Sequence, residues 1–284
     1  MPTSSPTTVI ELVRRSFSTL TPTEKKVAHA LMARYPAAGL TGVTELALES
    51  KTSTASVVRL VQKLGFDGFA SFHAALLSEL STREAGPRER LASAVDPESG
   101  ILSGLSTALA HSVASIADTV PAAEYEAAVT LLTNPQHRIT MVGGRVSQAW
   151  AEMFATYIAR ARRDVSVLSR DPGRRTASLL DLSSKHVLVA FDFRRYDDET
   201  VKVVETAHQR HAKVILVTDL WLSPAASYAD IVLPVPVDVP SPFDTSLTAL
   251  ALVECLTWSI VQQLGPAGAE RMREWDGLAL HAPA

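Results

Sequence analysis

The chain has 284 residues, of which 46% are hydrophobic and 20% charged, with 27 Lys and Arg against 30 Asp and Glu. This composition is typical of a globular protein with a sizeable core, and it excludes bulk disorder. The length suggests two domains or one large one. Cys255 is the only cysteine, which excludes a disulfide framework and a cysteine-based metal cluster.

The charged side chains are unevenly distributed. Residues 1–85 contain nine basic and seven acidic side chains, whereas the remaining residues contain 18 and 23. This division is compatible with a polyanionic partner for the first segment only. The first residues show no basic start followed by an apolar run, and the apolar stretch Leu247–Leu264 contains Glu254 and two glutamines. We therefore expect a cytoplasmic protein in which this stretch is a buried core helix and not a membrane span.

Residues 1–85 predict an all-α domain. Thr21–Glu24 combines a capping pattern with a proline at the first helical position, and the helix that it begins should end at Tyr35-Pro36. Further helices are expected over about 43–49, 53–64 and 69–80. Residues 86–135 predict a helical connector, part of which packs on the domain that follows.

From residue 136 onward, short β-rich runs alternate with helical patterns. Several of these runs are continuously apolar, as is typical of parallel strands that are buried on both faces. The alternation predicts an α/β domain over 136–284 with a doubly wound parallel sheet of five strands. The strands are expected at 138–142, 165–168, 187–191, 214–218 and 231–235, and the helices at about 146–162, 175–182, 198–211 and 244–264.

The segment Thr44–Leu64 has the pattern of a helix-turn-helix, whose second helix enters the major groove of DNA. Its inward face recurs every three to four residues, and Arg59 is expected on an exposed face with Ser56 and Lys63. Arg pairs with guanine edges, whereas Lys, Ser and the helix N-terminus hold phosphates. The residues predicted to contact DNA are Lys51, Thr52, Ser53, Thr54, Ser56, Arg59 and Lys63. The alternative is an amphipathic helix with ordinary surface charges, and periodicity alone does not distinguish the two.

Residues 20–36 and 43–76 resemble the helix-turn-helix domain of the RpiR/MurR family of bacterial transcription regulators. The pattern S-x-x-[ST]-V-x-R-x-x-x-K-L-G-F is present as Ser53, Ser56, Val57, Arg59, Lys63, Leu64, Gly65 and Phe66. Members of the family usually have Gly in the tight turn, where Lys51 stands here. A lysine with a positive φ at this position costs about 1 kcal/mol, which the fold can absorb.

In that family a sugar-isomerase (SIS) domain follows, and residues 136–264 are similar to one in element order and spacing. The resemblance implies a repressor or activator, a dimer or larger, that is controlled by a phosphorylated sugar. Two loops depart from the SIS pattern, however. The family's G-x-G-x-S loop reads Gly143–Ser147 with Arg145 at the second glycine, and its S-x-S-G-x-T loop reads Asp192–Asp197 with none of the pattern residues retained. A glycine and hydroxyl nest around a phosphate is therefore not expected.

Ligands of doubly wound sheets bind beyond the carboxyl ends of the strands, where both loops lie. The candidate ligand residues are Gly143, Gly144, Arg145, Ser147, Asp192, Arg194, Arg195 and Asp197. In one interpretation the arginines hold a carboxylate or phosphate. In the other, the loop residues Asp192, Arg194, Arg195 and Asp197 form an internal ion-pair network, and no ligand binds there.

These patterns predict a DNA-binding transcriptional regulator controlled by a small anionic metabolite, either a sugar phosphate or a carboxylate. Its partners would be double-stranded operator DNA, the metabolite, and a second copy or three further copies of the chain in a homodimer or homotetramer. No catalytic residue, metal ligand or cofactor is predicted. One alternative is a sugar-phosphate aldose–ketose isomerase that uses Glu254 as its base. Another is a DNA-binding protein whose SIS-like domain only oligomerises.

Overall fold

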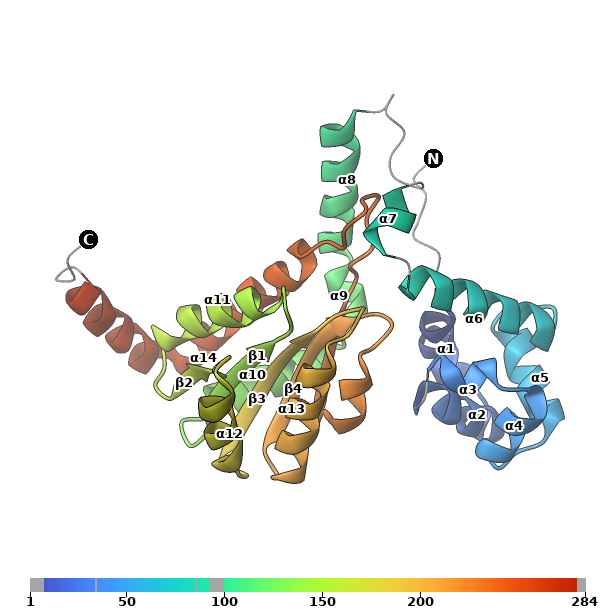
Figure 1. Cartoon of the computed structure of the whole chain (residues 1–284), viewed down its shortest axis with the longest axis horizontal. Coiled ribbons are helices and arrows are strands. Elements are labelled where there is room, and N and C mark those ends of the chain that lie inside the picture. The colour runs from blue at the N-terminus through green and yellow to red at the C-terminus, as the bar shows by residue number, and fades with distance from the viewer. Residues whose placement is uncertain (1–7, 34, 85, 92–99, 280–284) are drawn as a thin grey trace. The chain divides into compact units, whose positions relative to one another are not determined.

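The computed structural model describes residues 8–33, 35–84, 86–91 and 100–279. The chain divides into two compact units, Met1–Ala94 and Val95–Ala284, whose elements are labelled in Figure 1. The division falls in residues 92–99, outside the described ranges, as does the expected boundary at residue 85. The helices expected as a separate connector after residue 100 belong to the second unit.

The first unit is all-helical over its described residues. Its helices are α1 (Val9–Ser16), α2 (Pro22–Ala33), α3 (Ala37–Leu40), α4 (Val43–Glu49), α5 (Thr54–Lys63), α6 (Phe69–Glu84) and α7 (Pro87–Arg90), with a 3-10 turn, η1, at Phe17–Thr19. The expected capping box begins α2: the Thr21 N–H donates to Glu24 Oε2 at 2.8 Å, and the Glu24 N–H donates to Thr21 Oγ1 at 3.3 Å.

A separate hydrophobic core holds this first unit together. It includes the predicted inward face of α5, formed by Val57, Leu60, Val61 and Leu64. Leu46 of α4 and Phe72 of α6 are buried in the same cluster. The position of α5 in its unit is therefore fixed by apolar packing against the neighbouring helices.

The second unit begins with three helices, α8 (Ile101–Ala114), α9 (Ile116–Thr119) and α10 (Ala122–Thr133). Five parallel strands follow, in the spatial order β2-β1-β3-β4-β5. The doubly wound sheet expected from the sequence is therefore present. Its elements are β1 (Arg138–Gly143), α11 (Gln148–Ala159), β2 (Val165–Val167), α12 (Pro172–Leu180), β3 (His186–Asp192), α13 (Asp198–Gln209), β4 (Lys213–Asp219), η4 (Pro224–Tyr228), β5 (Ile231–Val235) and α14 (Leu247–Ala279).

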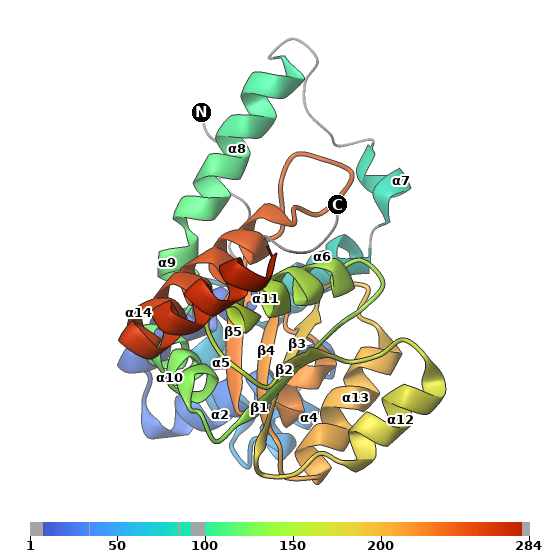
Figure 2. The same cartoon turned by 90° about the vertical axis from the view of Figure 1, so that its left-hand side faces the viewer.

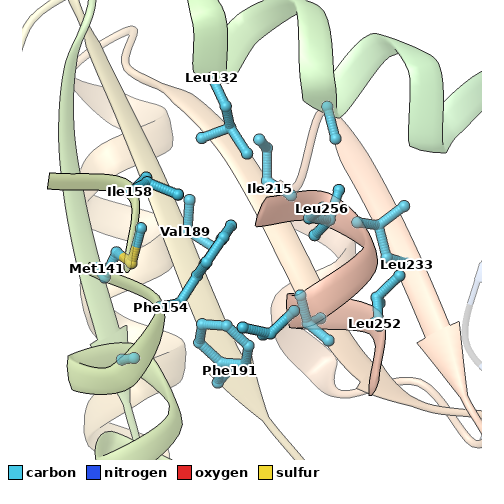
Figure 3. Packing of buried hydrophobic residues seen from close by; sticks show 14 of the residues in the cluster. Leu132, Met141, Phe154, Ile158, Val189, Phe191, Ile215, Leu233, Leu252 and Leu256 are labelled. Atoms are coloured by element: carbon cyan, nitrogen blue, oxygen red, sulfur yellow. The ribbon is translucent and has the colours of Figure 1, made fainter. Parts of the chain in front are cut away.

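Helices cover both faces of this sheet (Figure 2). Val189 and Phe191 of β3 pack with α10, α11 and α14, whereas Leu188 and Ala190 of the same strand pack with α13. Alternate residues of a strand point to opposite faces, which explains why β3 is buried along nearly its whole length. Figure 3 shows the first of these layers, in which Phe154 of α11 points toward side chains of β3 and α14.

The last helix, α14, is longer than the sequence patterns indicate. It continues to Ala279, with a kink at Gly265, where φ is +54° and a proline follows. Among the described residues it is the one helix that is long and apolar enough to cross a membrane by length and composition. Its side chains Leu252, Leu256 and Ile260 are buried against the sheet, whereas Trp258 is 64% exposed. The expected core helix is therefore buried along one face only.

Both edge strands of the sheet are short or interrupted. β2 has three residues, and β5 contains Pro234, which is paired in register with Thr218 of β4. A proline has no backbone N–H to donate, so within sheets it is tolerated mainly in edge strands.

Candidate functional site

The turn between α4 and α5 has the geometry of a helix-turn-helix. Lys51 adopts φ +52°, so the left-handed position expected at this residue is present without a glycine. The Thr52 N–H then donates to the Ala47 carbonyl at 2.9 Å. Ser53 is extended and caps α5, because its side-chain oxygen accepts from the Ser56 N–H at 3.3 Å. The turn therefore ends α4 and begins α5 within four residues.

The exposed face of α5 differs from the expected one. Ser56 is 3% exposed and does not lie on the outer surface as predicted. Its hydroxyl lies 3.0 Å from the Ser53 hydroxyl and accepts from Arg59 Nη2 at 3.1 Å. Ser56 lies directly beside the buried Val57 on the flank of the helix, so packing at the N-cap covers it. Arg59 is exposed, as expected.

Lys63 is bonded within its own unit. Its Nζ donates to the Thr19 carbonyl at 2.7 Å and to Glu24 Oε2 at 3.2 Å. The backbone N–H of Thr21, with the Lys63 ammonium, holds the pKa of Glu24 below its ordinary value despite partial desolvation. Lys63 thus connects the end of α5 to the start of α2. The phosphate contact that the sequence suggests for Lys63 stays a prediction, since its side chain is 35% exposed.

In the second unit, the sheet order reverses between β1 and β3, and such a reversal is where ligands of doubly wound sheets bind. The loop after β1 contains Gly143, where a Cβ would lie 2.4 Å from the backbone carbon of Ser147. Ser147 is 6% exposed; its hydroxyl accepts from the Gly144 N–H at 2.9 Å and donates to the Phe191 carbonyl at 2.7 Å. Gly143 therefore allows a tight turn, and the Ser147 hydroxyl ties this loop to β3.

Arg194, in the loop after β3, is 7% exposed and forms ion pairs with Asp238 and Asp244. Its Nε donates to Asp244 Oδ2 at 2.7 Å, and its backbone N–H donates to Asp219 Oδ2 at 2.6 Å. Burial alone would lower the pKa of Arg194, but the hydrogen bonds and charges of Asp244 and Asp238 outweigh it and raise the pKa above its ordinary value. Among the described residues, its Nη1 has no hydrogen-bond partner.

The neighbouring carboxylates are also internally bonded. Asp197 caps α13 by accepting from the Thr200 N–H at 3.0 Å. Asp192 accepts from the Asp197 N–H at 3.1 Å and from the Ser223 hydroxyl. An internal network is therefore present, but its partners differ from those expected. Arg194 pairs with aspartates between β5 and α14, not with Asp192 or Asp197.

Burial shifts the acidity of two of these carboxylates. Desolvation raises the pKa of Asp192 to about 6, against its hydrogen bonds from Ser223 and Asp197. Desolvation likewise raises the pKa of Asp219 to about 6. A carboxyl whose folded pKa exceeds its unfolded value binds more protons in the folded state, so its contribution to stability falls as pH rises from about 4 to about 6.

Replacing Asp192 with Asn should flatten this pH dependence. Asn stays neutral and can donate to Ser223. As the pH rises from 4.5 to 7, the unfolding free energy of the variant should therefore increase by about 2 kcal/mol relative to that of the wild type. The measurement is denaturant unfolding of both proteins across that range. Glu126→Gln, which removes an exposed acid on α10, is the control. Parallel wild-type and Asp192→Asn curves would show that Asp192 ionises normally.

Two candidate ligand residues remain exposed. Arg145 follows β1 and Arg195, with φ +59°, follows β3. Neither forms an ion pair within the described part of the chain. These two guanidinium groups, one on each side of the β1/β3 reversal, are exposed, whereas Arg194 is buried and paired with Asp238 and Asp244.

Several residues were not singled out by the sequence patterns. Asp238 and Asp244 lie 44 and 50 residues from Arg194, and no local motif indicates the pairing. Gln62 is exposed on α5, and a helical wheel could have placed it beside Arg59. Glu254, which the sequence offered as the base of an isomerase, is exposed, as is Cys255. No cluster of three or more His, Cys, Asp or Glu placed for a metal ion occurs in the described ranges.

Each of the two units matches a known protein family in sequence. Residues 7–83 match the helix-turn-helix domain of the rpiR family, and residues 132–259 match the SIS domain. An HTH-type transcriptional regulator of Haemophilus influenzae is 25% identical over 228 residues, which cover 79% of this chain and 78% of that protein. A second such regulator, from Caldanaerobacter subterraneus, is 23% identical over 229 residues, covering 79% of each.

Solved structures share the fold. The Vibrio vulnificus NanR protein, complexed with ManNAc-6P, has a TM-score of 0.57 at 19% identity and covers 97% of this chain and 100% of its own. The sugar isomerase domain of an RpiR transcription factor from Sphaerobacter thermophilus has a TM-score of 0.56 at 22% identity, covering 61% of this chain and 96% of its own. With an rpiR-type helix-turn-helix joined to an SIS domain, this chain belongs to the RpiR family of transcriptional regulators.

Proposed function

We propose that the chain is a metabolite-controlled, DNA-binding regulator that acts in the cytoplasm as a dimer or tetramer and has no catalytic activity. The observation that carries the DNA-binding part is the capped helix α5, which presents Arg59 outward after a tight left-handed turn. Lys51, Thr52, Ser53 and Thr54 lie at its N-terminus, where backbone N–H groups and a lysine favour phosphate.

The DNA test uses the full-length protein and fragments of its own genome. Phosphate contacts should make the logarithm of the affinity fall linearly with the logarithm of salt concentration. Arg59→Ala should weaken binding by roughly tenfold or more, as for loss of an arginine paired with guanine. Arg160→Ala removes the same charge from an exposed position of the second unit and should not change binding. Equal affinity for all three proteins would contradict the assignment.

For the metabolite, we propose a small anion held by Arg145 and Arg195 at the β1/β3 reversal. Two exposed guanidinium groups on adjacent loops fit a phosphate or carboxylate. The ManNAc-6P bound to the NanR protein is a sugar phosphate, which supports this class. The aldose–ketose isomerase alternative has less support, since Glu254 is exposed.

A thermal-shift screen with sugar phosphates and small carboxylic acids tests this site. A ligand that stabilises the wild type should stabilise the double variant Arg145→Ala/Arg195→Ala far less. The matched control, Arg160→Ala/Lys202→Ala, removes two exposed cations, one at the end of α11 and one in α13, and should respond as the wild type does. If both double variants respond alike, the ligand does not contact Arg145 or Arg195. If no compound stabilises the wild type, the second unit has another role, such as oligomerisation.

A further inference from the structure

Fewer polar side chains of α5 face outward without an internal contact than its sequence pattern suggests. Ser56 is buried and Lys63 is bonded to Thr19 and Glu24. The exposed side chains opposite the buried face are those of Ala55, Arg59 and Gln62, spaced four and three residues apart. This spacing places them in one row, because an α-helix has 3.6 residues per turn.

Gln62 is the unassigned member of this row. It is exposed, and its side-chain amide makes no hydrogen bond to the residues that the structure describes around it. Its Cα lies about 4.5 Å beyond that of Arg59 along the helix axis. With α5 in a major groove, as proposed above, a side chain at this distance would reach a base pair close to the one assigned to Arg59, since stacked base pairs are about 3.4 Å apart.

Contacts around this row hold the Arg59 side chain and the helix α5 in position. Ser56 Oγ accepts from Arg59 Nη2 at 3.1 Å, which leaves the other nitrogens of the guanidinium for an outside acceptor. Lys63 and Glu24 hold the far end of α5 against α2. The row therefore lies on a helix that is stabilised at its start by the Ser53 cap and at its end by the Lys63 ion pair.

We propose that Gln62 is a specificity-determining residue that reads an adenine next to or near the guanine read by Arg59, with Ala55 contacting the same groove. A glutamine amide both donates and accepts, and it matches the N6 and N7 edge of adenine, as arginine matches the O6 and N7 edge of guanine. Lys63 does not read bases; it holds the helix in place. This inference rests on the proposed DNA binding and specifies which side chains make the sequence-dependent contacts.

The test selects preferred sites from a random duplex library with the full-length wild type and then measures affinity for every single-base variant of the selected site. Gln62→Ala should lose the preference at one A·T position in each half-site, with roughly tenfold weaker discrimination there. Its salt dependence should not change, because an uncharged amide releases no counterions. Gln62→Glu should shift the preference at that position toward cytosine, whose amino group a carboxylate accepts.

Lys63→Met is the matched control from the same helix. It should lower the melting temperature of the first unit and leave every base preference unchanged. If Gln62→Ala keeps all preferences of the wild type, or if Lys63→Met loses one, the inference is overturned while DNA binding stands. If the wild type selects no sequence at all, the proposed function and this inference fail together.

Discussion

Replacing Arg194 with Ala should destabilise the second unit by about 2–3 kcal/mol. This is less than for a fully buried ion pair, because the side chains of Asp238 and Asp244 are 38% and 31% exposed. Asp238 and Asp244 would lose their shared cation, and the two carboxylates would repel each other. Asp219 would keep its hydrogen bond from the backbone of residue 194 but lose the nearby positive charge. The melting temperature of this unit should fall by on the order of 10 °C.

Calorimetry of the full-length protein measures this effect. Arg145→Ala removes an exposed arginine from the neighbouring loop and should change stability by no more than about 0.5 kcal/mol. Arg194→Lys keeps the charge but loses the bidentate hydrogen bonding of the guanidinium, so its stability should lie between those of the wild type and Arg194→Ala. If Arg194→Ala and Arg145→Ala have the same melting temperature, the ion pairs with Asp238 and Asp244 contribute little to the stability of the second unit.

Replacing Phe72 with Ala should destabilise the first unit by about 3–5 kcal/mol, as for other buried aromatic residues. Phe72 is fully buried, and its ring centroid lies 5.6 Å from those of both Phe66 and Phe69. The truncation would leave a cavity and remove two aromatic contacts. The core in which α5 packs would therefore loosen, and DNA affinity should fall with it.

The two units have separate cores, so Phe72→Ala should lower one calorimetric transition and leave the other in place. For a unit of this size the shift should be on the order of 20 °C. Leu77→Ala, on the same helix α6 but 48% exposed, serves as the control and should have little effect. A common shift of both transitions would show that the units unfold together.

The predictions that proved accurate depend on local sequence. The span Val43–Glu49 and the cap at Ser53 follow from apolar spacing and capping residues within a few positions. The five strands are apolar runs separated by helical patterns, and the parallel sheet follows from that alternation. Such signals are complete within one segment, so they do not require knowledge of the packing.

The contacts that were missed join segments distant in the chain. Lys63 and Glu24 are 39 residues apart, and Arg194 meets Asp244 across 50 residues. Sequence patterns identified Lys63 and Arg194 but not their partners, because the pairing depends on how the helices and loops pack. The burial of Ser56 has a simpler cause: its spacing relates it to Arg59 and Lys63, but it also borders the buried face of α5 beside Val57.

Pro234 in β5 and the brevity of β2 limit the geometries open to the dimer or tetramer proposed above. Joining two sheets edge to edge requires a continuous row of free backbone N–H and carbonyl groups, and neither border strand provides one. We therefore expect subunits to meet through side chains on their helices, where single substitutions can adjust the strength of assembly without disturbing the hydrogen-bonded framework of the protein.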